Sequence, residues 1–175
     1  LYQRAVAHLH QAAKTFPTDE TVRLAYTRAL NSLGAFHSAE GRNRLALESY
    51  AAATKIAEEL DEEHWRTRLI TLGNHAQLLG RLDRVRQARK VAKTAFQLAE
   101  KLFEKEPRAP RPLEDLISAE LRYARLLRAA PGADRRGARR FAKKAFDRLS
   151  GLPKSDSRRR VNLSRGLKAL LQELR

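Results

Sequence analysis

Residues 30–56 read LNSLGAFHSAEGRNRLALESYAAATKI, and this stretch decides the fold of the chain. Leu30, Leu33 and His37 recur at i, i+3 and i+7, so they share one face of a helix. Gly41 interrupts the pattern, and the same period then resumes on a second helix with Ala46, Tyr50, Ala53 and Ile56. Gly34 has no Cβ, which allows the second helix to cross the first closely. The stretch therefore predicts a helix–turn–helix unit.

A unit of this kind cannot bury its apolar face alone, so it should recur along the chain. Leu72 and Gly73 follow Leu33 and Gly34 by 39 residues, and Gly80 follows Gly41 at the same interval as a second turn glycine. The residues of the second helix recur as well, first as Ala92, Phe96, Ala99 and Leu102 and then as Ala138 and Ala145. This repetition predicts a solenoid of stacked helix pairs.

The pattern resembles that of tetratricopeptide repeats, which combine Leu-Gly, a turn glycine and a later series of alanine, aromatic and alanine residues. The residues that carry it here are Leu30, Leu33, Gly34, Gly41, Ala46, Tyr50 and Ala53. His37 replaces the usual aromatic residue, and Glu58 falls near the place of the usual proline. The run from Leu30 to Gly34 is most similar to the longer repeats of the kinesin light chain type. The resemblance implies a right-handed solenoid that binds partner proteins.

We expect one all-α domain over residues 1–175, a right-handed α-solenoid of about eight antiparallel helices. The repeat pattern divides it into the second half of a repeat (1–16), two repeats (20–60 and 62–106), a divergent repeat (113–150) and a terminal or capping helix (157–174). Asp19 and the acidic run from Asp61 to Glu63 should begin helices. Because residues 1–16 match half a repeat and the chain has no methionine, we expect a fragment of a longer protein.

Local substitutions set the divergent repeat apart. Three prolines within residues 107–112 predict a stiff loop before it, and the Pro-Gly pair at 131–132 predicts a turn. Leu121 stands where the pattern has Gly73, which weakens the expectation of a close helix crossing there. The predicted core of the chain consists of nine large residues: Leu30, Leu33, Tyr50, Trp65, Leu69, Leu72, Phe96, Leu121 and Phe146.

The sequence gives no reason to expect an enzymatic activity. It has no cysteine, no Gly-x-Gly-x-x-Gly loop, no Walker-type Gly-Lys-Ser/Thr and no His-Glu-x-x-His pattern. The five histidines, at positions 8, 10, 37, 64 and 75, include no pair at the i, i+4 spacing of a helical metal site. We therefore expect no catalytic residues, no cofactor and no bound metal.

In tetratricopeptide solenoids the first helix of each pair lines a concave groove that holds partner peptides or helices. Polar residues beside the packing positions of these helices are therefore candidates for a partner-binding groove: Asn31, Ser38, Asn74, Gln77, Arg122 and Arg125. The Asn74 amide both donates and accepts hydrogen bonds, so it can hold an extended main chain. Arg122 and Arg125 can make bidentate contacts to a carboxylate or phosphate. The alternative is that all six are ordinary solvated residues.

The net charge of +16 is concentrated toward the C-terminus, where residues 106–175 hold 19 Lys and Arg against 8 Asp and Glu. A candidate basic patch consists of Arg136, Arg140, Lys143, Lys144, Arg158, Arg159 and Arg160. Such a patch can attract an acidic protein partner or the phosphates of nucleic acid or lipid, or it can be a solvated face. Base-stacking aromatic residues are missing around it, which argues against single-strand recognition.

We therefore expect a non-catalytic scaffold that holds a peptide or helix of a partner in its groove, with acidic residues docking on the C-terminal repeats. A cytoplasmic location is expected. The sequence has no run of about 18 apolar residues, so it predicts no membrane span. Three alternatives remain: an electrostatic nucleic-acid binder, a regulatory segment that packs on a catalytic domain of the same protein, and self-association through the apolar face of the first helix. That face is formed by Ala5, Leu9 and Ala12.

Overall fold

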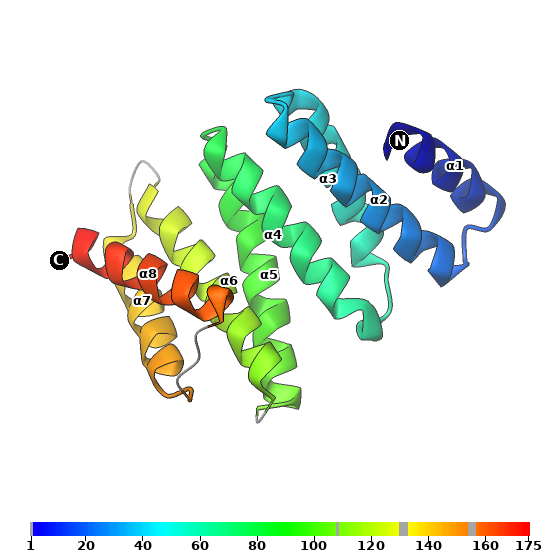
Figure 1. Cartoon of the computed structure of the whole chain (residues 1–175). Helices are drawn as coiled ribbons and strands as arrows, with labels where there is room; N and C mark the ends of the chain where they lie inside the picture. The colour runs from blue at the N-terminus through cyan, green and yellow to red at the C-terminus, as the bar shows by residue number, and fades with distance from the viewer. Residues whose placement is uncertain (1, 108, 130–132, 154–156) are drawn as a thin grey trace. The chain divides into compact units, whose positions relative to one another are not determined.

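The computed structural model describes residues 2–107, 109–129, 133–153 and 157–175, and within these ranges it contains helices and turns but no strand. This confirms the prediction of an all-α chain (Figure 1). In chain order, the elements are α1 (Tyr2–Thr15), α2 (Glu20–Ala39), α3 (Asn43–Glu58), the 3-10 helix η1 (Glu62–His64), α4 (Trp65–Arg81), α5 (Val85–Lys105), α6 (Pro110–Ala129), α7 (Arg135–Ser150) and α8 (Arg158–Glu173). No helix among the described residues is long and apolar enough to cross a membrane.

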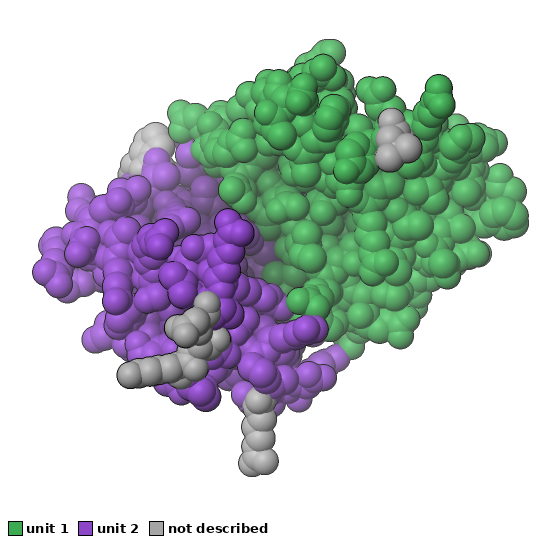
Figure 2. Space-filling model, viewed as in Figure 1, with its two compact units in different colours: residues 1–84 green, residues 85–175 purple. Residues whose placement is uncertain are grey.

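The chain forms two compact units, unit 1 (Leu1–Arg84) and unit 2 (Val85–Arg175), which Figure 2 colours green and purple. Unit 1 contains α1 to α4, and unit 2 contains α5 to α8. The boundary between the units falls inside the segment 62–106, which the repeat pattern assigns to one repeat. A single domain over residues 1–175 stays a prediction.

The helix starts follow the capping chemistry at some positions and depart from it at others. Asp19 caps α2 as predicted, because its Oδ1 accepts the backbone N–H of Thr21 at 2.8 Å. The acidic run after Leu60 was expected to begin the fourth helix, but it forms η1, and α4 starts only at Trp65. Pro110 lies in the first turn of α6 rather than in a loop, because the first turn needs no N–H from proline. The turn predicted at 131–132 lies outside the described residues.

Unit 1 depends on a close crossing of α2 and α3. A Cβ built on Gly34 would lie 2.9 Å from two ring carbons of Tyr50, closer than real Cβ contacts come. The Tyr50 side chain is 5% exposed, so its ring has little room to move away. This confirms the prediction that a missing Cβ at Gly34 permits the crossing. Ala46 and Ala53, on either side of Tyr50 on α3, are fully buried.

The C-terminal ends of α2 and α4 have the same backbone motif. In α4, however, the residue with the positive φ is not the glycine that the repeat pattern predicts. At the end of α2, Gly41 has a φ of 71°, its N–H donates to Ser38 O, and the next N–H donates to His37 O. At the end of α4 the corresponding residue is Asp83, with a φ of 57° and the same two hydrogen bonds, to Gly80 O and Leu79 O. Gly80 was predicted to be the turn glycine, and this is wrong, because Gly80 lies within α4.

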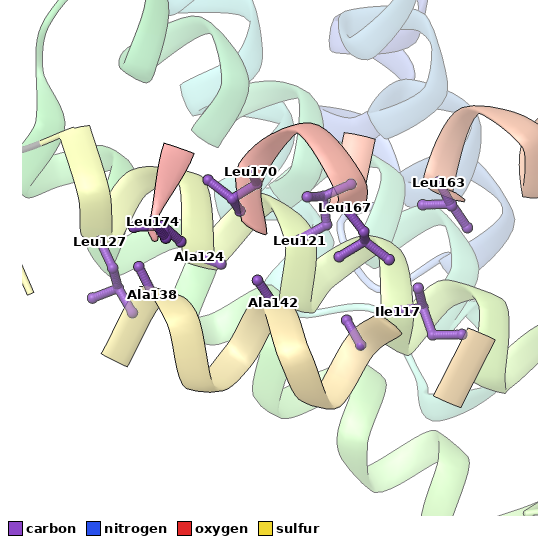
Figure 3. Close-up of a cluster of buried hydrophobic side chains, with 11 residues drawn as sticks. Ile117, Leu121, Ala124, Leu127, Ala138, Ala142, Leu163, Leu167, Leu170 and Leu174 are labelled. Atoms are coloured by element: carbon purple, nitrogen blue, oxygen red, sulfur yellow. The ribbon is translucent and has the colours of Figure 1, made fainter. Parts of the chain in front are cut away.

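Unit 2 has a core in which α6, α7 and α8 meet, as Figure 3 shows. Alanines of α7 pack against large aliphatic residues of α6 and α8, and the labelled members are Ile117, Leu121, Ala124, Leu127, Ala138, Ala142, Leu163, Leu167, Leu170 and Leu174. Leu121 is accommodated by a glycine on the partner helix, because a Cβ on Gly166 would lie 3.1 Å from Leu121 Cδ2. On α5, Arg89 binds the last turn of α6 by donating to the carbonyls of Leu126 and Leu127, at 3.0 Å and 2.6 Å.

The predicted core is confirmed in its leucines and only in part in its aromatic residues. Six of the nine predicted residues are buried: Leu30, Leu33, Tyr50, Leu69, Leu72 and Leu121. Trp65, Phe96 and Phe146 are half-buried. The ring centroids of Phe96 and Phe141 lie 5.2 Å apart, and Tyr123 packs beside Phe141. These rings therefore lie at the margin of the buried core rather than inside it.

Substituting Gly34→Ala should destabilise unit 1 by about 1–2 kcal/mol, because overpacking costs about 1–3 kcal/mol and helix propensity returns up to about 1 kcal/mol. Urea unfolding followed by circular dichroism measures the change. In a Tyr50→Leu background the steric conflict is gone, so Gly34→Ala should become stabilising. Destabilisation of the same size in both backgrounds would contradict the role given to the ring.

Substituting Asp83→Gly should stabilise the chain by about 0.5–1 kcal/mol, because glycine adopts a positive φ without steric cost. The matched control is the reverse exchange in the other motif, Gly41→Asp, which should destabilise by a similar amount. Denaturant midpoints of both variants measure the two effects. If Asp83→Gly leaves the free energy of unfolding unchanged while Gly41→Asp lowers it, the positive φ of Asp83 does not strain the chain.

Candidate functional site

Four of the predicted groove residues lie on the face that α2 and α4 form in unit 1, where these two helices contact each other. Asn74 Nδ2 on α4 donates to Asn31 Oδ1 on α2 at 3.2 Å. About two helical turns further toward each C-terminus, Arg81 Nη1 donates to Ser38 Oγ at 3.1 Å. The structure therefore brings together residues that the repeat pattern placed at related positions, and it adds Arg81, which the sequence analysis did not select.

A pocket of about 250 Å³ opens beside these contacts. Its lining combines apolar side chains with two amides, two hydroxyls and a guanidinium: Ala35, Ser38, Ala39, Tyr50, Asn74, Gln77, Leu78 and Arg81. Three of the predicted groove residues, Ser38, Asn74 and Gln77, are among them. The small residues Ala35 and Ala39 leave the space that the pocket occupies. The signal that could have found Arg81 is its spacing, since it follows Asn74 by seven residues and so shares the same helix face.

The pocket is positively charged and rich in hydrogen-bonding groups. No carboxylate among the described residues pairs with Arg81, which is exposed. Burial raises the pKa of the Tyr50 hydroxyl, and the charge of Arg81 opposes that shift. Such a site can donate hydrogen bonds to a carbonyl or carboxylate and can accept them from an amide.

The other two predicted groove residues, Arg122 and Arg125, lie on α6 in unit 2. Arg125 is exposed, and its guanidinium lies against α8, since its Nη2 would be 2.7 Å from a Cβ on Gly166. Arg122 is half-buried, and no ion pair to it is found within the described residues. Burial lowers the pKa of Arg122, and the charges of Arg125 and Arg159 lower it further. An anion bound here would relieve the repulsion between these cations.

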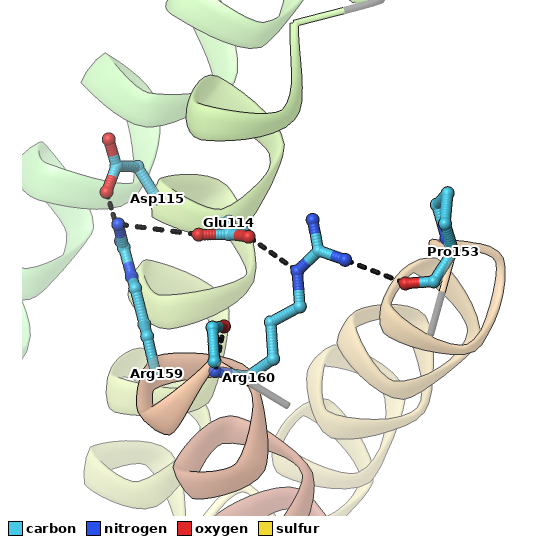
Figure 4. Close-up of polar contacts among 6 residues, drawn as sticks. Glu114, Asp115, Pro153, Arg159 and Arg160 are labelled. Carbon is cyan, nitrogen blue, oxygen red and sulfur yellow. Dashed lines mark hydrogen bonds and ion pairs between the residues drawn. The ribbon is translucent and has the colours of Figure 1, made fainter. Parts of the chain in front are cut away.

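Two members of the predicted basic patch are structural rather than free. Arg159 forms ion pairs with Asp115 and with Glu114, the latter at 3.7 Å, and these acids lie on α6 (Figure 4). Arg160 Nε donates to Glu114 at 2.6 Å, and its Nη1 donates to the carbonyl of Pro153 at 2.7 Å. These contacts join α8 to α6. Arg159 and Arg160 therefore differ from the exposed cations of α7, because they are paired with acids of α6 that lie more than forty residues earlier in the chain.

The remaining members of the predicted patch are exposed. Arg136, Arg140, Lys143 and Lys144 lie on the outer face of α7, and Arg158 lies at the start of α8. Lys144 Nζ is 3.9 Å from a carboxylate oxygen of Glu100 on α5. On α1, proposed for self-association, Ala5 is exposed while Leu9 and Ala12 are half-buried, so part of that face is covered within the chain.

One set of side chains could hold a metal ion. Glu20, Glu63 and His64 each offer a ligand atom, and these atoms lie within 4.8 Å of one another. No spacing in the sequence indicates this set, because Glu20 comes from the first turn of α2 and the other two residues come from η1. Contacts among these residues and with Asp61 explain why the three side chains lie together. Glu20 accepts the N–H of Asp61 at 2.7 Å, and His64 Nε2 is 3.7 Å from Glu20. The set therefore ties η1 to the start of α2.

Glu120 on α6 is a fully buried acid, and it is paired with Arg148 on α7. Arg148 also lies over the ring of Phe103 on α5, with 5.6 Å from its guanidinium carbon to the ring centroid. Burial raises the pKa of Glu120, and the hydrogen bond and charge of Arg148 oppose this shift. A buried acid with a raised pKa can serve proton transfer, but Glu120 has no exposure to a substrate. Its role is to join two helices of unit 2.

No protein-family model matches the chain, and no curated protein is similar to it at a significant level. The function of the chain is therefore inferred from the contacts and charges of its own surfaces.

The Glu120 carboxyl should make stability depend on pH. Since burial raises its pKa, the folded chain keeps the proton at a higher pH than the unfolded chain, whose glutamate pKa is about 4.3. Its contribution is complete below that pH and is lost as pH rises through the folded-state pKa. The unfolding free energy of the natural chain should therefore fall relative to that of Glu120→Gln as pH rises from about 4. Parallel pH profiles for the two proteins would contradict this.

A pair of substitutions separates the ion pair from the packing. Arg148→Leu alone should cost about 3–5 kcal/mol, because it leaves a buried carboxylate without its partner. Adding Glu120→Leu should recover most of that loss and abolish the pH dependence, since an apolar pair then replaces the charges. Failure of the second substitution to restore stability would show that Arg148 acts through its other contacts.

Proposed function

We propose that this chain is a non-catalytic protein-interaction scaffold that binds a peptide segment of a partner in the pocket between α2 and α4. The observation that carries the proposal is the pocket itself, which gathers Ser38, Asn74 and Gln77 beside an exposed Arg81. In this proposal the helices form a right-handed solenoid of tetratricopeptide-like repeats with antiparallel neighbours, and the protein acts in the cytoplasm.

The pocket suits an extended main chain with an acidic side chain. Asn74 uses one amide hydrogen for Asn31, and its other groups can reach a partner backbone. Gln77 is exposed one turn away and offers a second amide. Arg81, held toward Ser38, supplies the positive charge that a carboxylate requires. The apolar walls formed by Ala35 and Leu78 can take the aliphatic part of that side chain.

The preference for acidic partners extends to unit 2. Arg122 and Arg125 on α6 present guanidinium groups whose mutual repulsion an acidic residue would relieve. Guanidinium groups bind carboxylates with two parallel hydrogen bonds, which adds specificity to the charge. We therefore propose that a partner segment is acidic where it contacts unit 2.

Panning a library of short peptides on the immobilised full chain should enrich acidic sequences. Substituting Asn74→Ala together with Arg81→Ala should weaken the binding of enriched peptides about 10- to 100-fold, because each lost hydrogen bond is worth about 0.5–1.5 kcal/mol. Dissociation constants by fluorescence anisotropy measure the change, and thermal unfolding checks that the variant is folded.

The matched control removes one cation and one amide from another surface, Arg86→Ala with Gln97→Ala, both exposed on α5. This control should bind the enriched peptides like the natural chain. Equal weakening in both variants, or enrichment of peptides without acidic residues, would overturn the proposed site.

A further inference from the structure

The outer face of α7 carries a dense set of cations that the proposed peptide site does not use. Six basic residues occupy the first ten positions of the helix: Arg135, Arg136, Arg139, Arg140, Lys143 and Lys144. We propose that this face binds the phosphate backbone of double-stranded nucleic acid without reading its sequence. The proposal is independent of the pocket in unit 1.

The geometry of the helix concentrates four of these cations. At about 100° per residue, Arg136, Arg139, Arg140 and Lys143 fall within an arc of about 100°, and all four are exposed. The opposite side of α7 is fixed in the core, where Ala138, Ala142 and Ala145 are fully buried. The cations therefore cannot turn away from solvent without unfolding the helix. We call these four residues the α7 basic surface.

The α7 basic surface keeps most of its charge. Among the acids around α7, Asp134 and Glu100 are engaged in other contacts, and Asp147, one turn beyond Lys143, is the acid on the same face of the helix. No ion pair to any of its four residues is found in the described part of the chain. Asp134 uses its carboxylate to cap the helix, accepting the N–H of Gly137 at 2.7 Å. Glu100 lies 3.9 Å from Lys144, at the edge of the surface. This differs from α8, where Arg159 and Arg160 are neutralised by acids of α6.

The surroundings favour duplex nucleic acid over other anionic partners. Membrane binding by a basic helix needs apolar side chains beside the cations, and none of the large exposed hydrophobic residues in the described ranges lies on α7. Binding of single strands needs aromatic rings free to stack on bases. The nearest rings, Phe96, Tyr123 and Phe141, pack on one another at 5.2–6.2 Å between centroids. Arg140 covers one of these rings, with 5.7 Å from its guanidinium carbon to the centroid of Phe141. Closely spaced cations without a free aromatic ring beside them match a regular row of phosphates.

The test measures binding of the full chain to labelled duplex DNA and duplex RNA of the same mixed sequence, at several salt concentrations. Four phosphate contacts predict a slope of log K against log salt of about −3.6, since each contributes about −0.9 for a duplex. The variant Arg136→Gln, Arg140→Gln, Lys143→Gln should weaken binding about tenfold or more at low salt and reduce the slope by about 2.7. Circular dichroism checks that the helix content is unchanged.

The control removes the same charge from unit 1, with Arg28→Gln, Lys55→Gln and Arg66→Gln, which are exposed on α2, α3 and α4. It should retain the affinity and salt slope of the natural chain, as should the pocket variant Asn74→Ala, Arg81→Ala. Equal loss in both triple variants would show that net charge alone drives binding and would overturn the α7 basic surface. Absence of duplex binding, or tighter binding to polyglutamate or to anionic phospholipid vesicles than to either duplex, would also overturn it.

Discussion

Close packing of alanines on α3, α5 and α7 is the constraint on which the rest of the structure depends. The alanines recur at intervals of 46 residues and are at most 1% exposed: Ala46, Ala53, Ala92, Ala99, Ala138 and Ala145. Small side chains let two helices approach closely enough for a large residue on one to reach the backbone of the other, as the Tyr50 ring reaches Gly34. Once α2 is held in this rotation, Asn31 and Ser38 must lie on the face that meets α4. The pocket is therefore a consequence of how the core packs.

Periodicity in the sequence predicts the features that depend on how the helices pack. It does not predict the features that depend on contacts with residues far away in the sequence. The pairing of Gly34 with the second helix, the cap at Asp19 and the grouping of Ser38, Asn74 and Gln77 follow from spacing along single helices. Arg159 and Arg160 could not be separated from the free cations, because their partners lie on another helix far away in sequence. Similarly, Asp83 adopts a positive φ through the hydrogen bonds at the end of α4, although Gly80 was the more obvious candidate.

The α6–α7 pair carries charged residues at positions that are apolar in the predicted repeat pattern. In the repeat alignment Glu120 takes the position of Leu72, 48 residues earlier, and Arg148 takes that of Leu102, 46 residues earlier. Two apolar positions have thus become an ion pair between α6 and α7. Desolvation of two charges is costly, so the pair adds little net stability compared with leucines. Its effect is instead to make the α6–α7 contact sensitive to pH and intolerant of losing either partner.

The net charge of the whole chain is a poor guide to the charge of any one of its surfaces. Three of the 19 cations in residues 106–175 are used in ion pairs inside unit 2: Arg148 on Glu120, Arg159 on Asp115, and Arg160 on Glu114. Among the cations outside these pairs, two guanidinium groups lie on α6 and four cations lie on the outer face of α7, while Arg158, Arg165 and Lys168 are exposed on α8. The first set is sparse, which suits individual carboxylates on a peptide. The second is dense and regular, which suits a polymer of phosphates. The cations outside the internal ion pairs of unit 2 therefore differ in density from one helix to the next, and surfaces of different density suit different partners.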